Sequence, residues 1–134
     1  MLTKDDIESF LVRLASTGAT YSEVEPGFWI VRPSAESDLS IAVNYSPPVL
    51  LLRIDVMTLP ADGGRSATLT RRLLELNASD LLHGSYGIQD DQIVLTEALE
   101  LSALDFEEFL ASYESMTLAL ASHLRELGSY REAR

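Results

Sequence analysis

The stretch Leu69–Phe109, LTRRLLELNASDLLHGSYGIQDDQIVLTEALELSALDFEEF, decides the fold of this 134-residue chain. Its leucine-rich beginning predicts a helix that starts near Ser66 and ends before Gly84. The acidic dipeptide Asp90-Asp91, between two apolar runs, favours a hairpin. Asp105, with a glutamate three residues on, predicts the N-cap of a long last helix. The stretch therefore predicts a helix, a hairpin and a second helix.

The chain before this stretch predicts one helix and then a run of strands. Ile7, Phe10, Leu11 and Leu14 recur at helical spacing, and Gly18 ends that helix. The apolar period then changes from 3.6 to 2, which indicates strands joined by short turns. These predicted strands span Tyr21–Val24, Phe28–Arg32, Leu39–Tyr45 and Val49–Thr58, and the first two form either one bent strand or two.

The fold class predicted is α+β, with one twisted antiparallel sheet covered by helices in the order α-β-β-β-α-β-β-α. The length favours a single domain over residues 1–134. Val49–Thr58 is expected to be a central strand with two unequal faces. One face carries Leu50, Leu52, Ile54 and Val56, and the other carries Val49, Leu51, Arg53, Asp55 and Met57.

Composition restricts the possible partners. The net charge of −11 opposes binding to nucleic acid and to anionic membranes. One explanation of this acidity is that the charge keeps the protein soluble. The alternative is that the acidic surface binds a basic or disordered partner. The absence of cysteine excludes disulfides and thiolate metal sites. No signal peptide or membrane span is visible, so we expect a soluble cytoplasmic protein.

Residues that could carry catalysis are few. His83 lies near a predicted helix end, and His123 is expected to point to solvent, with no partner at metal-ligand spacing. Asp90-Asp91 offers too few oxygen ligands for calcium and reads better as a solvated turn. We therefore expect no catalytic residue, no cofactor and no metal, although an enzyme is not excluded.

Apolar residues are more numerous than a one-sheet monomer obviously needs. The simplest explanation is a well-filled core. The alternative is a homodimer with a groove that receives an extended peptide along a strand edge or beside a helix.

The order of elements resembles the type III secretion chaperone-like fold, which includes CesT-type secretion chaperones and YbjN-like proteins. The distinctive residues are LLELN at 73–77, Gly84, Tyr86 and Gly87, then IVLTEALEL at 93–101 and LDFEEFL at 104–110. The resemblance covers essentially the whole chain in element order. It implies a small acidic cytoplasmic homodimer that lacks enzymatic activity and holds an extended segment of a client or effector protein.

The resemblance also implies roles for particular residues. Client contact would involve the first helix and the sheet, and dimerisation the second helix and its neighbouring strand. Ile7, Leu11, Leu14, Trp29 and Val31 are thus the expected client-binding residues, and Leu69, Leu73, Leu76 and Tyr86 the expected dimer interface. The YbjN-like alternative is a regulatory or adaptor domain of the same fold that has no secretion client.

Overall fold

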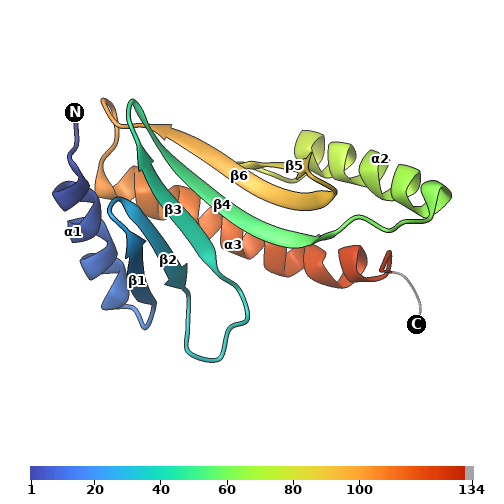
Figure 1. Ribbon diagram of the computed structural model, residues 1–134, viewed down its shortest axis with the longest axis horizontal. Coiled ribbons are helices and arrows are strands. Elements are labelled where there is room, and N and C mark those ends of the chain that lie inside the picture. Colours follow the sequence, from blue (N-terminus) through green and yellow to red (C-terminus); the bar gives the residue numbers. More distant parts are fainter. Residues whose placement is uncertain (132–134) are drawn as a thin grey trace.

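Six antiparallel strands form one sheet in the computed structural model, which describes residues 1–131. The strands lie in the order β1-β2-β3-β4-β6-β5, so β1 and β5 are the two edges. Three helices accompany the sheet within these residues, which confirms the predicted α+β class (Figure 1). The elements are α1 (Lys4–Ala15), β1 (Thr20–Glu25), β2 (Phe28–Arg32), β3 (Ile41–Ser46), β4 (Val49–Thr58), α2 (Gly63–Ser79), β5 (Ser85–Gln89), β6 (Gln92–Glu100) and α3 (Phe106–Gly128).

The first two predicted strand pieces are separate strands, β1 and β2, so the order is α-β-β-β-β-α-β-β-α. They form an antiparallel hairpin whose turn contains Gly27, with a positive φ of 80°. A Cβ at Gly27 would come within 3.2 Å of the Lys4 side chain. The backbone angle favours glycine there, whereas the flexible Lys4 side chain could move away from a Cβ.

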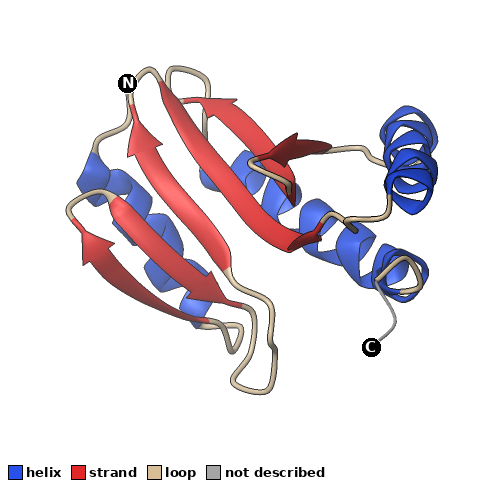
Figure 2. Ribbon diagram, turned by 45° about the vertical axis from the view of Figure 1, so that its right-hand side comes forward, coloured by secondary structure: helices blue, strands red, loops and turns tan. Residues whose placement is uncertain are grey.

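Helices α1 and α3 cover one face of the sheet (Figures 1 and 2). Thr3 and Asp6 form a capping box at the start of α1, and Asp105 accepts a hydrogen bond from the Glu108 backbone N–H at the start of α3. Phe10 of α1 packs against Phe106 and Phe109 of α3, with ring centroids 5.7 Å apart in each pair. The core lies between these two helices and the sheet, and the buried side of α2 extends it. Its largest fully buried side chains are Trp29, Phe109, Ile7, Leu11, Ile41, Leu50, Leu52, Ile54, Leu69, Leu76, Ile93 and Leu95.

Strand β4 departs from the predicted alternation at its end. Its register with β6 shifts between Asp55 and Met57, as at a β-bulge. The extra residue moves Met57 onto the core face, where it is buried, and leaves Val56 only half-buried. The assignment of Val56 to the apolar face and Met57 to the other was therefore wrong, because strict alternation does not allow for a bulge.

Helix α2 begins and ends earlier than predicted. Asp62 is its N-cap, accepting from the Gly64 N–H at 3.0 Å, and the helix ends at Ser79. Gly84 does not end the helix; it leads into β5 with a φ of +81°, and its N–H donates to the Glu97 carboxylate. A Cβ at Gly84 would lie 3.2 Å from Met116 and from the Thr96 carbonyl oxygen. The glycine is thus needed because the backbone passes close to β6 and α3.

Polar contacts hold α2 to α3 and β5. Arg72 donates from Nε and Nη2 to the Glu126 carboxylate at 2.5 Å and 3.2 Å. His123 of α3 is buried, with Nδ1 2.7 Å from the Tyr86 hydroxyl and Nε2 3.2 Å from Asp80 Oδ2. The expectation that His123 points to solvent was wrong, because its ring supplies hydrogen-bond partners to both β5 and the end of α2.

We expect these contacts to make the fold sensitive to acid. Hydrogen bonds from Ser79 and His123 lower the pKa of Asp80, and hydrogen bonds from Arg72 lower the pKa of Glu126. A carboxylate with a lowered folded-state pKa stabilises the fold above its unfolded pKa of about 4, and this contribution is lost as the pH falls further. Urea unfolding should therefore show the free energy of unfolding falling between about pH 5 and about pH 3.

The double variant Asp80→Asn, Glu126→Gln should be less stable than wild type at neutral pH and should lose less stability over the same pH range. A matched variant, Glu36→Gln and Glu100→Gln, removes two exposed carboxylates that make no side-chain hydrogen bond or ion pair within residues 1–131. It should keep the wild-type acid dependence. An equally steep fall in the Asp80, Glu126 variant would contradict the role of these two groups.

Candidate functional site

The second face of the sheet has no helix over it (Figures 1 and 2). Cross-strand partners share a face, so the register identifies the side chains on this uncovered face. Phe28 pairs with Asn44, which pairs with Leu51, and Leu51 pairs with Ala98. In the next row Ile30 pairs with Ala42, Ala42 with Arg53, and Arg53 with Thr96. Apart from Asn44 and Arg53, the side chains in these two rows are apolar or small.

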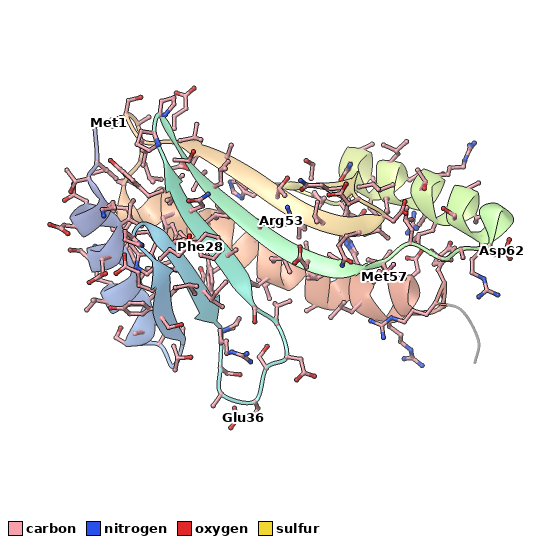
Figure 3. All side chains as sticks on the ribbon, viewed as in Figure 1. Met1, Phe28, Glu36, Arg53, Met57 and Asp62 are labelled. Atoms are coloured by element: carbon pink, nitrogen blue, oxygen red, sulfur yellow. The ribbon has the colours of Figure 1, made fainter. Side chains whose placement is uncertain are left out.

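Two adjoining hollows of about 430 Å³ and 390 Å³ lie on this face. They share Phe28, Ala42 and Arg53, so together they form one shallow trough that crosses β6, β4, β3 and β2. Figure 3 labels Phe28 and Arg53 on this face. The lining of what we call the trough comprises Phe28, Ile30, Asp38, Leu39, Ser40, Ala42, Asn44, Leu51, Leu52, Arg53, Asp55, Gln89, Thr96, Glu97 and Ala98.

Arg53 is the cation at the centre of the trough, and its hydrogen bonds are made within the chain. Its Nε donates to Asp55 Oδ1 at 2.9 Å, and its Nη1 donates to Gln89 Oε1 at 2.5 Å. The ion pair with Asp55 offsets the positive charge and holds the guanidinium against the strands. The trough can therefore accept apolar groups without an uncompensated charge at its centre.

The two edges of the sheet differ. The side-chain amide of Asn77 donates to the Tyr86 carbonyl oxygen at 3.1 Å and accepts from the Tyr86 N–H at 2.7 Å. These bonds occupy outward-facing backbone groups of β5, as a neighbouring strand would. Strand β1 pairs with β2 on one side, and within the described residues no strand pairs with its other side. Val24 of β1 is 58% exposed, so this edge is accessible.

The structure brings the expected client-binding residues together, but inside the core. Ile7, Leu11 and Leu14 lie on the buried face of α1, and Trp29 and Val31 lie on the face of β2 that α1 and α3 cover. All five are buried in the isolated chain. Client contact through them stays a prediction, and the more accessible alternatives on the same strand are the half-buried Phe28 and Ile30.

The expected dimer residues are buried as well. Leu69, Leu73 and Leu76 form the buried side of α2, and Tyr86 is buried on β5. Their assignment to a dimer contact also stays a prediction. On the outer side of α2, Leu74 is 64% exposed and is free to contact another molecule.

The alternation along β4 predicted which residues form the uncovered face, but it did not predict a binding function for that face. Alternation correctly grouped Leu51, Arg53 and Asp55 on one side of β4, opposite Leu50, Leu52 and Ile54. Leu51, Phe28 and Ile30 are apolar residues on the less apolar faces of their strands. Their presence there was the available signal for a binding surface. The trough also requires the register of four strands, which composition and period do not determine.

Two observations concern titratable groups within residues 1–131. Burial raises the pKa of Tyr113 to about 12. Within residues 1–131 no three His, Asp or Glu side chains converge as metal ligands. None of the helices in that range combines the length and apolar character that crossing a bilayer requires.

Comparisons with known proteins place the fold. A model of the CesT_Tir_1 family matches residues 2–133. No curated protein matches the chain. Among solved structures, a chain of the heterodimeric ExoU-SpcU complex from the type III secretion system of Pseudomonas aeruginosa aligns with a TM-score of 0.62 at 16% identity, covering 90% of this chain and 96% of that one.

Two further structures are similar. A chain of the HopA1-SchA chaperone-effector complex aligns with a TM-score of 0.64 at 10% identity, covering 91% of this chain and 92% of that one. YbjN from E. coli, described as a proposed transcription regulator, aligns with a TM-score of 0.68 at 13% identity, covering 96% and 93%. At these identities the solved structures establish the fold, which is the type III secretion chaperone-like fold.

Substitutions on the two faces of β4 should separate exposed from core positions. Leu51 is 38% exposed on the uncovered face, so Leu51→Asp should change the free energy of unfolding by less than about 1 kcal/mol. Leu52 is fully buried, so Leu52→Asp should leave the chain unfolded, because an unpaired charge would enter the core. Circular dichroism and urea unfolding measure both. Unfolding of the Leu51 variant would show that this face is covered in solution.

Proposed function

The chain belongs to the CesT_Tir_1 family, and from this premise we propose that it is a non-catalytic chaperone that holds an extended segment of a client protein. The observation that carries the proposal is the trough on the uncovered sheet face. An exposed apolar surface with a polar rim is typical of a site where another protein binds. The solved HopA1-SchA structure is a chaperone-effector complex, which supports a client of the same kind here.

The edge of β1 suits the extended form of the client. Its outward-facing N–H and C=O groups can pair with another strand, which provides affinity that does not depend on sequence. The trough can then select side chains. The β1 edge runs along the strands and the trough crosses them, so one client segment would turn from the edge into the trough to use both.

A homodimer formed through α2 and β5 is part of the proposal. Leu74 on α2 and Ile88 on β5 are exposed apolar residues on these two elements. The same two elements are anchored to the core by buried side chains, which are Leu69, Leu73, Leu76 and Tyr86. Because each chain has a net charge of −11, two copies repel each other. A dimer therefore needs a specific apolar contact of this kind. We place its action in the cytoplasm.

An adaptor role is the second candidate. The likeness to YbjN extends over 96% of this chain, and a domain of this fold can bind a folded partner in place of an extended client. The two functions differ in the state of the bound protein. The adaptor would bind a partner that is folded on its own.

Purification of the tagged chain from its own cells tests the client. Co-purifying proteins are identified by mass spectrometry, and the bound segment by limited proteolysis of the complex. We expect one protected segment that is unfolded in isolation. Leu51→Asp should release it, whereas Leu118→Asp, at an exposed position of α3 on the helical side, should retain it. Recovery of a folded partner that Leu51→Asp still binds would favour the adaptor role.

Light scattering of the purified chain tests the dimer. We expect twice the chain mass of 14.8 kDa. Leu74→Glu should give a folded monomer, because a charge replaces an exposed apolar contact, whereas Leu73→Glu should unfold the chain because Leu73 is buried. A wild-type chain that stays monomeric at high concentration would contradict the homodimer.

A further inference from the structure

The charges around the trough are unevenly distributed. Asp55 is neutralised by Arg53 within the trough. Three other acids lie near its two ends: Glu25 and Asp38 beside β2, and Glu100 on β6. None of the three has an ion-pair partner among the described residues, and all three are exposed. They can therefore interact with an incoming partner.

The register places each of these acids. Glu25 is the cross-strand partner of Phe28, and Asp38 lines the trough directly. Glu100 lies two residues beyond Ala98 on β6 and so has its side chain on the same face. Besides Arg53, alternation along β2 places Arg32 on this face, four residues along the strand from Phe28 and on the side of Asp38, whose negative charge it offsets. Glu25 and Glu100 therefore leave an excess negative charge at each end. Between them lies the neutralised Arg53–Asp55 pair with apolar and small side chains.

From this arrangement we infer that the client segment held in the trough is a short apolar run with lysine or arginine on both sides. The inference rests on the proposed function and adds the chemistry of the client to it. The trough crosses from β6 to β2 over three strand spacings, about 14 Å, which corresponds to about four or five residues of extended chain. Basic residues that flank such a run would lie opposite the acids at the two ends.

An acidic client would be disfavoured for the same reason. Its flanking charges would face Glu25, Asp38 and Glu100, and the single guanidinium in the trough is already paired with Asp55. Juxtaposed like charges select against wrong partners. This surface can therefore select client segments by the sign of the charges beside the apolar run, as well as by the apolar run itself.

Three synthetic peptides test the inference. Each carries the same alternating leucine and alanine run, about five residues long to match the trough, with paired lysines, glutamines or glutamates on both sides. Binding to the full chain is measured by isothermal titration calorimetry at low and high salt. We expect the lysine peptide to bind about tenfold more tightly than the glutamate peptide at low salt, since several weak exposed pairs contribute together. The difference should shrink as salt is added.

Two variants assign the effect to the trough. Glu25→Gln combined with Glu100→Gln should remove most of the preference for lysine, whereas Glu114→Gln on α3 should keep it. Leu51→Asp should abolish binding of the glutamine peptide. Equal binding of the three peptides that still depends on Leu51 would overturn the charge inference and leave the proposed function standing. If no peptide binds, or if binding does not depend on Leu51, both are overturned.

Discussion

The packing of α3 against one face of the sheet is the constraint on which the rest of the structure depends. Its buried side chains, which include Phe109, Met116 and Leu120, contribute to the core along most of its length. A 23-residue helix is about 35 Å long, which is enough to lie across a sheet of this size. Helix α1 fills the remaining space beside it through Phe10. Because both helices lie on the same side, the opposite face of the sheet is left to solvent or to a partner.

The polar attachment of α2 follows from this one-sided arrangement. Helix α2 lies beside β5 and reaches α3 through Arg72 and through the Asp80–His123–Tyr86 contacts (Figure 1). Its buried leucines supply apolar contact, and its hydrogen bonds determine its position. Unlike apolar packing, such bonds have defined donors and acceptors, so they orient a helix that has few neighbours.

Element type and order could be predicted from the sequence because apolar period and turn residues are local properties. The capping residue Asp105, the hairpin at Asp90-Asp91 and the two faces of most of β4 belong to this group. The bulge beside Met57, the early end of α2 and the burial of His123 could not be predicted, because each depends on a neighbour distant in sequence. The trough belongs to the second group. Its lining comes from β2, β3, β4 and β6, with Gln89 of β5 and the loop before β3, and only the strand register and the absence of a helix show it.

The Asn77 amide has a consequence for how copies of this chain can join. A sheet that adds strands at both edges can grow without limit, as in a fibre. Here the contacts to Tyr86 occupy backbone groups at the β5 edge, so strand addition is obstructed there and open at β1. The proposed dimer joins α2 and β5 through exposed side chains such as Leu74 and Ile88 and needs no backbone pairing between β5 strands. A single side chain thus confines strand addition to the edge that a client would use.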